Sequence, residues 1–130
     1  MKPFTSYIIP TLSVSNGSAA IEFYQKAFGT EVVFGDTDPD GKTVAVLEVE
    51  GAQFVVADES PEHGNFSPEA IDGKISVRIG LMVNDPDAMA ERAIAAGATV
   101  VYPVADQPYG YRLGHFVDPF GHHWEIGKPL

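Results

Sequence analysis

A chain of 130 residues that is 45% hydrophobic is long enough to bury a core, and we expect a single globular domain over residues 1–130. The absence of cysteine excludes disulfides, thiolate metal sites and thiol nucleophiles. The formal net charge of −10 disfavours nucleic acid and anionic membranes as partners, and it favours a neutral or cationic small molecule.

The first half of the chain has the pattern of a strand, a helix and three further strands. Residues 7–14 are strand-like, Ser15-Asn16 offers an N-cap, and apolar residues then recur at helical spacing until Gly29. Short runs typical of strands follow at residues 31–34, 44–49 and 53–57. The spacing of the aromatic residues in the helix predicts that they pack against a sheet.

A polar connection, residues 59–74, separates the two halves and is longer than an ordinary loop. Its composition fits either a plain linker or a lid. The apolar side chains of Phe66 and Ile71 inside it indicate that part of the segment docks on the rest of the protein.

The second half follows the same order of elements as the first. Asn84-Asp85 precedes Pro86, which suits a first helical turn, and the helical pattern ends at Gly97. Strand-like runs follow at residues 99–102, 111–117 and 123–126.

The two halves also share residues at equivalent positions. At an offset of about 69 residues, two segments of the first half align with two of the second. The first pair is Val14-Ser15-Asn16 with Val83-Asn84-Asp85, and the second is Gly29-Thr30-Glu31-Val32-Val33 with Gly97-Ala98-Thr99-Val100-Val101. The sequence therefore predicts an α+β fold of two βαβββ modules, at about 4–58 and 75–128. Any residue in one module can be compared with its twin in the other.

The chain resembles the vicinal oxygen chelate superfamily, which is the glyoxalase/bleomycin resistance/dioxygenase group. The resemblance rests on the two modules, on the helix that ends Gln25-Lys26-Ala27-Phe28-Gly29, and on the ending Asp118-Pro119-Phe120-Gly121-His122-His123-Trp124-Glu125-Ile126. The segment from Tyr109 to Trp124 is most similar to the PhnB-like branch. The resemblance implies that each module curls into a half-barrel around a cavity, and that the chain forms a homodimer. It leaves the function open, because the superfamily includes metal-dependent enzymes and metal-free binding proteins.

The repeat tests whether the metal site of the family is present. The resemblance places metal ligands on the first and last strands of each module, and alignment of the modules puts Ile9, Val55, Arg78 and Glu125 at those positions. Isoleucine and valine have no lone pair, and arginine repels a dication. One carboxylate falls short of the three or more protein ligands of a tightly held catalytic metal. We therefore predict no metal cofactor.

An ion pair is the predicted replacement for the metal. If Glu125 points into the cavity, then His123 shares its face, since side chains alternate along a strand. We expect Arg78 to pair with Glu125 across the cavity floor, because an unpaired buried carboxylate is costly. The alternative is that Arg78 lies at a solvated rim.

His115 and three tyrosines complete the predicted site. The resemblance places His115 on the cavity face, where it would be a proton shuttle, a donor to ligand, half of a metal pair or an ordinary buried histidine. Tyr109 and Tyr111 border the cavity mouth in the family, and Tyr7 shares the strand parity of Ile9. Flat rings with a polar tip suit a planar ligand that is both stacked and hydrogen-bonded.

Two functions are compatible with these residues. The first is a metal-free protein that binds a small organic molecule, such as a toxic or antibiotic-like compound. The second is a metal-dependent lyase, isomerase or dioxygenase-like enzyme that uses Glu125 with His115 around one divalent ion. Because the sequence has neither a membrane-length apolar run nor a secretory leader, we expect a cytoplasmic protein.

Overall fold

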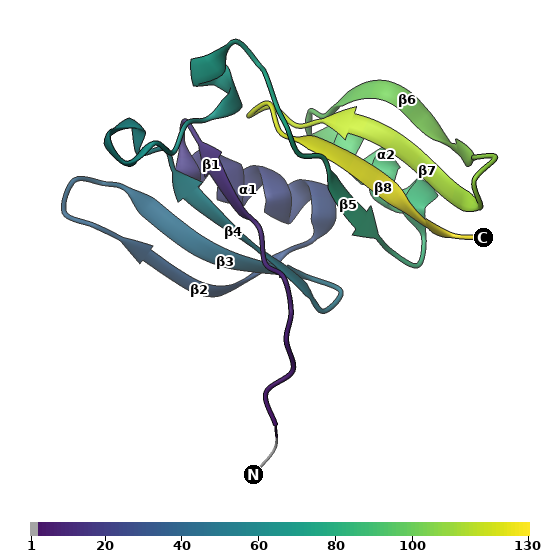
Figure 1. Cartoon of the computed structure of the whole chain (residues 1–130), viewed down its shortest axis with the longest axis horizontal. Helices are drawn as coiled ribbons and strands as arrows, with labels where there is room; N and C mark the ends of the chain where they lie inside the picture. Colours follow the sequence, from purple (N-terminus) through teal and green to yellow (C-terminus); the bar gives the residue numbers. More distant parts are fainter. Residues whose placement is uncertain (1–2) are drawn as a thin grey trace.

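The computed structural model of the chain describes residues 3–130, and it contains two four-stranded sheets, each with one long helix. The element order is strand, helix and three strands, used twice, so the predicted α+β fold of two βαβββ modules is confirmed. Both helices lie behind the sheets in Figure 1, and the sheets turn their other faces to the viewer. We call these open faces cup one and cup two.

Module one forms sheet one, in the order β1-β4-β3-β2. Its helix begins after Asn16, whose side chain accepts a hydrogen bond from the Ala19 N–H, and ends at Gly29 in the left-handed conformation. The elements are β1 (Thr11–Val14), α1 (Gly17–Phe28), β2 (Glu31–Thr37), β3 (Thr43–Val49) and β4 (Ala52–Asp58).

Module two repeats this order in sheet two, β5-β8-β7-β6. Asp85 caps its helix by accepting a hydrogen bond from the Ala88 N–H, and Pro86 occupies the first turn as predicted. The elements are β5 (Ile79–Met82), α2 (Pro86–Ala96), β6 (Thr99–Asp106), β7 (Tyr111–Val117) and β8 (His123–Pro129). In both sheets the first strand runs parallel to the last.

The predicted strand over residues 7–14 is too long, because β1 begins only at Thr11. Pro10 has no N–H to donate to β4, although its carbonyl accepts a hydrogen bond from the Val55 N–H at 2.8 Å. Residues 3–9 form an arm without regular secondary structure, and its outer part extends away from the body (Figure 1). Strands β2, β6 and β8 continue for three or more residues beyond their predicted ends.

The connection between the modules carries two short 3-10 helices, η1 (Pro61–His63) and η2 (Pro68–Ile71). The Ser15 hydroxyl donates to the Glu69 carboxylate at 2.9 Å, and the Ser67 backbone N–H donates to Glu59 at 3.1 Å. Ser67 itself is fully buried. Part of this connection therefore docks on the body, although Phe66 and Ile71 remain exposed.

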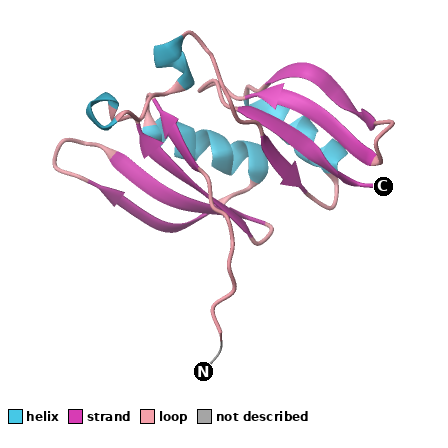
Figure 2. Ribbon diagram, viewed as in Figure 1, coloured by secondary structure: helices cyan, strands magenta, loops and turns pink. Residues whose placement is uncertain are grey.

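Aromatic side chains from both modules form the centre of the core. Figure 2 shows the two long helices behind the two sheets. Tyr24 of α1 lies against Phe54 of β4 and Trp124 of β8, with ring centroids 5.2 and 5.6 Å apart. Trp124 also meets Phe28 at 4.8 Å. One core thus spans both modules. None of the described helices has the length and apolar character needed to cross a membrane.

A buried carboxylate, Asp118, ties this aromatic cluster to module two. It accepts hydrogen bonds from the Tyr24 hydroxyl and from the Trp124 indole N–H, the latter at 2.8 Å. The backbone N–H groups of Phe120 and His122 donate to its other oxygen at 2.9 and 3.0 Å. Burial, followed by the negative charge of Asp118, raises the pKa of Tyr24 well above its usual value, so its hydroxyl remains a donor.

The variant Tyr24→Phe tests this bond. It removes one donor from a buried carboxylate, so we expect the free energy of unfolding to fall by about 1–3 kcal/mol in urea titrations. Tyr111→Phe, at a partly exposed tyrosine, is the matched control and is expected to change little. Equal stability of the two variants would show that the Asp118 carboxylate does not depend on Tyr24.

Candidate functional site

Cup two is formed by alternate side chains of β7 and β8. His115 lies directly opposite Glu125, and Leu113 lies opposite Gly127, so these residues share the face turned away from α2. Trp124 is buried on the other face, as predicted. A hollow of about 330 Å³ on this face is lined by Gly80, Met82, Tyr109, Tyr111, Leu113 and Glu125.

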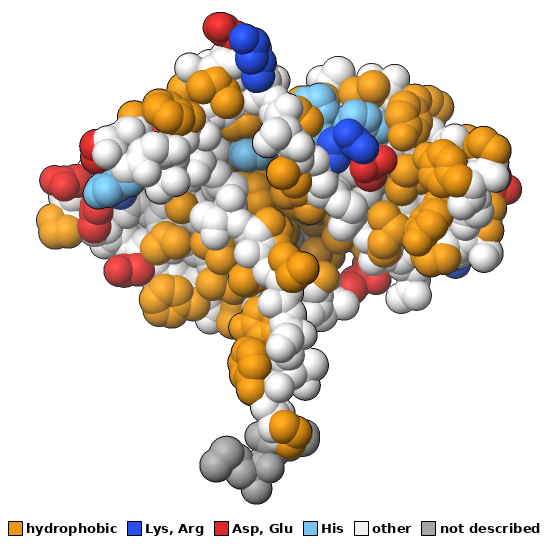
Figure 3. All heavy atoms as spheres, in the orientation of Figure 1, with side chains coloured by type: hydrophobic (Ala, Val, Ile, Leu, Met, Phe, Trp, Pro, Cys, Tyr) orange, Lys and Arg blue, Asp and Glu red, His pale blue; other side chains and the backbone are white. Residues whose placement is uncertain are grey.

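The predicted ion pair is present at this hollow. Arg78 Nε donates to Glu125 Oε1 at 3.1 Å. The Glu125 side chain is 23% exposed and the Arg78 side chain is 58% exposed, so the pair lies at the rim of the cup and not on its floor. Figure 3 shows basic, acidic and histidine side chains together over sheet two, beside hydrophobic ones.

A histidine pair lies next to the ion pair. His115 Nε2 and His123 Nδ1 are 2.8 Å apart, so one ring donates and the other accepts, and at least one of them is neutral. Desolvation, followed by the charge of His123, lowers the pKa of His115. Glu125 opposes this shift and Arg78 adds to it. The arrangement can hold a proton on one ring and present the second ring as a neutral hydrogen-bonding group.

Three tyrosines surround the charged groups. Tyr109 and Tyr111 have ring centroids 6.4 Å apart, and Tyr109 is 60% exposed at the mouth. Tyr102 lies opposite His115 in the register and meets it edge to face, with centroids 5.6 Å apart. Partial burial, followed by the neighbouring Tyr109, raises the pKa of Tyr102. These rings can stack on a flat ligand while their hydroxyl groups hydrogen-bond to it.

Cup one carries an apolar row, next to which Glu48 and Gln53 share the same face and are hydrogen-bonded at 3.1 Å. Its open face is defined by the register of β2, β3 and β4, in which Phe34 lies opposite Val46 and Val46 lies opposite Val55. Val44 and Ala57 extend this apolar row. Val55 is the twin of Glu125, so the position that carries a carboxylate in cup two carries an aliphatic side chain in cup one.

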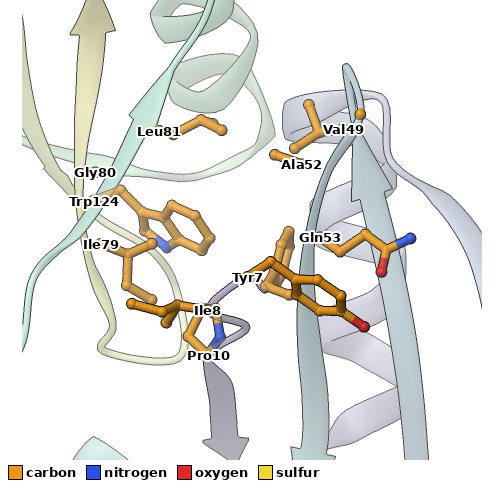
Figure 4. A pocket seen from close by; sticks show the side chains of 12 residues that line it. Tyr7, Ile8, Pro10, Val49, Ala52, Gln53, Ile79, Gly80, Leu81 and Trp124 are labelled. Atoms are coloured by element: carbon orange, nitrogen blue, oxygen red, sulfur yellow. The ribbon is translucent and has the colours of Figure 1, made fainter. Parts of the chain in front are cut away.

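Tyr7 does not join the other predicted site residues. It belongs to the arm, where it is 66% exposed, and it lines a separate apolar cleft of about 640 Å³ between the two sheets. Figure 4 shows Tyr7 and Ile8 between β4 residues such as Ala52 and β5 residues such as Leu81. The expectation that Tyr7 joins the cup relied on its sharing a strand face with Ile9. Alternation of faces does not apply to Tyr7, because the arm is not part of the β1 ladder.

The four positions that the resemblance assigns to metal ligands do not form a metal site. Arg78 and Glu125 lie on cup two, whereas Val55 lies on sheet one and Ile9 precedes β1 there. Of these four residues, only Glu125 has a side-chain oxygen that could bind a metal. That carboxylate already accepts a hydrogen bond from the Arg78 guanidinium. Among residues 3–130, no three His, Asp or Glu side chains are arranged to hold an ion. The residues present therefore do not fit the metal of the family.

The structure adds Tyr102, Met82 and Gly80 to the site. The pairing of Tyr102 with His115 was not predictable, because the sequence pattern ended β6 at residue 102 and gave no register for it. Gly80 lies opposite Glu125 in β5 and lines both the cup and the cleft. The repeat pairs Gly80 with Thr11, and neither position carried a functional signal in the sequence.

Comparisons with known proteins agree with this architecture. Residues 7–126 match the model of the Glyoxalase/Bleomycin resistance protein/Dioxygenase superfamily. An uncharacterised protein of Mycobacterium bovis is 40% identical over 125 residues, which are 93% of this chain and 82% of that protein. A superfamily member from Sphaerobacter thermophilus is 27% identical, with a TM-score of 0.69 over 95% of this chain and 98% of that chain.

A second similar structure contains a metal and a small molecule. It is a mutant of the fosfomycin resistance protein FosX from Listeria monocytogenes, complexed with Mn(II) and 1S,2S-dihydroxypropylphosphonic acid. It is 17% identical, with a TM-score of 0.71 over 98% of this chain and 93% of that chain. At this identity the likeness concerns the fold.

The lowered pKa of His115 predicts a specific acid response. In the unfolded chain His115 titrates near 6.5, so the unfolded state takes up the proton first as the pH falls. The stability contributed by neutral His115 is complete above that pH and is lost as the pH falls toward the folded pKa. Urea denaturation at about pH 7.5 and at about pH 5.5 measures the free energy of unfolding that is lost between these pH values. We expect this loss to be smaller in His115→Asn than in wild type.

Direct titration of His115 by NMR gives the matching test. Glu125→Gln is expected to lower its pKa further, because the carboxylate favours the charged ring, and His123→Asn is expected to raise it. A His115 pKa at or above about 6.5 in the wild type would contradict the described environment.

Proposed function

Since the chain belongs to the glyoxalase/bleomycin resistance protein/dioxygenase superfamily, we propose that it is a metal-free member that binds a small organic molecule in cup two. Members of this superfamily bind small molecules. The observation that supports the proposal is the Arg78–Glu125 pair at the position of a metal ligand, flanked by three tyrosines. Sequestration of a toxic or antibiotic-like compound needs affinity and no reaction.

The proposal includes a homodimer in which cup one of each chain covers cup two of its partner. The hollow of cup two is shallow in one chain, whereas ligand sites commonly enclose most of their ligand. Large apolar side chains on both open faces are exposed, including Phe34 of cup one and Met82 of cup two. A two-fold axis would close two equal chambers, each with the apolar row of cup one facing the Arg78–Glu125 pair of cup two.

The arm supports the same assembly. Phe4 and Ile8 are exposed, Ile8 to 95%, and the outer part of the arm extends away from the body (Figure 1). Such apolar side chains are commonly covered by another surface.

We further propose that the chain is a single functional domain with modules at 4–58 and 75–128. We also propose that it belongs to the PhnB-like branch and that its location is cytoplasmic.

One observation favours the second candidate function, a metal-dependent enzyme. His115 lies directly opposite Glu125 in the register, so a nitrogen and a carboxylate already face the same cup. This function would require Arg78 to leave Glu125 and the bond between His115 and His123 to break. We rank it second because both groups already have partners.

A binding measurement tests the main proposal. We expect planar aromatic compounds to shift NMR signals of cup-two residues and to remain unchanged after long incubation. Loss of one stacking ring, in Tyr109→Ala or Tyr111→Ala, is expected to weaken binding by about 2- to 10-fold. Phe66→Ala, at an exposed aromatic of the connection, is the control. Conversion of a compound would favour the enzyme, and absence of any cup-two shift would contradict the binding function.

The dimer has its own test by analytical ultracentrifugation. We expect the wild type to sediment as a dimer and Phe34→Asp to shift it toward monomer, because a charge would be buried in the apolar wall. Ile94→Glu, at an exposed position on α2, is expected to leave the dimer intact. A monomeric wild type, or equal effects of the two variants, would contradict this assembly.

A further inference from the structure

The Arg78–Glu125 pair uses only part of the hydrogen-bonding capacity of its two groups. One bond joins them, from Arg78 Nε to Glu125 Oε1, and across residues 3–130 neither side chain makes another hydrogen bond. A guanidinium has five N–H donors in one plane, and a carboxylate has a second oxygen. The pair therefore presents an acceptor beside a set of donors, both at the rim of cup two.

The wall next to Glu125 is open to a ligand. Gly80 lies opposite Glu125 in the parallel register of β5 and β8. A Cβ placed on Gly80 would meet only the Met82 terminal methyl group, at 3.5 Å. Since no side chain projects from this position, a flat molecule can approach the free carboxylate oxygen.

Aromatic and apolar side chains flank this point. Tyr109 and Tyr111 lie on the same hollow as Glu125, with an angle of 42° between their rings, and Leu113 and Met82 complete its lining. Such a lining favours a planar ring, and its polar end would then meet the ion pair.

The opposite charges of Arg78 and Glu125 determine which polar group of a ligand can bind beside them. Glu125 and Arg78 neutralise one another, so an anionic ligand would meet a carboxylate that disfavours it, and a cationic ligand would meet the guanidinium. A neutral group with one acceptor beside one donor matches both partners at once. Hydrogen bonds to charged groups are stronger than those between neutral groups.

We infer that cup two recognises a neutral planar ring system that carries a lactam or similar amide edge. The N–H of that edge donates to the free oxygen of Glu125, and its C=O accepts from a terminal nitrogen of Arg78. This inference rests on the proposed binding function and names the ligand class for that same site.

Three related probes test the inference by calorimetry and NMR. The lactam 2-quinolinone has the required edge, 2-methoxyquinoline has the same rings without the N–H donor, and 2-naphthoate carries a negative charge. We expect the wild type to bind 2-quinolinone about tenfold or more tighter than either other probe. NMR shifts are expected at Tyr111 and His115 of cup two.

Variants of the pair complete the test. Arg78→Leu and Glu125→Leu are each expected to reduce the preference for 2-quinolinone over 2-methoxyquinoline to about onefold to threefold while ring binding persists. Glu22→Leu, at an exposed glutamate of α1, is the control and should keep the preference. Arg78 is largely exposed, so its variant tests the inference even if Glu125→Leu fails to fold.

The outcomes separate this inference from the binding function. Equal binding of all three probes, or a preference that survives in both variants, would overturn the lactam assignment and leave the binding function standing. Absence of binding by every probe would overturn both.

Discussion

The buried carboxylate of Asp118 is the interaction on which the rest of the structure depends. It accepts hydrogen bonds from a hydroxyl of α1, from an indole N–H of β8 and from two backbone N–H groups of the turn between β7 and β8. Four donors compensate a charge that would otherwise be costly to bury. Because Trp124 is fixed toward the helices, its neighbours His123 and Glu125 must face the cup.

The repeated modules have acquired different roles from the same backbone. Val55 and Glu125 occupy equivalent strand positions, and one makes an apolar wall while the other makes half of an ion pair. The two cups would therefore complement each other in a two-fold dimer, since each chamber takes one face of each kind. A ligand with a hydrophobic body and a polar edge suits such a chamber.

Much of this was predictable from sequence, for identifiable physical reasons. The caps at Asn16 and Asp85 are local signals, so both helices were predicted correctly. Residue alternation predicted that His123 and Glu125 share one face of β8, whereas the choice of the cup face came from the family resemblance. Tyr7 lies outside cup two, because the β1 ladder begins only after Pro10. Tyr102 was missed because strand register depends on long-range pairing that no local pattern encodes.

The central claim is that a guanidinium stands at Glu125 where the family resemblance places a metal. Crystals grown with excess manganese, with diffraction recorded at its absorption edge, test this claim most directly. We predict that Arg78 remains in contact with Glu125 and that cup two shows no anomalous peak. A peak bound to the Glu125 carboxylate, with the Arg78 side chain displaced, would contradict the account.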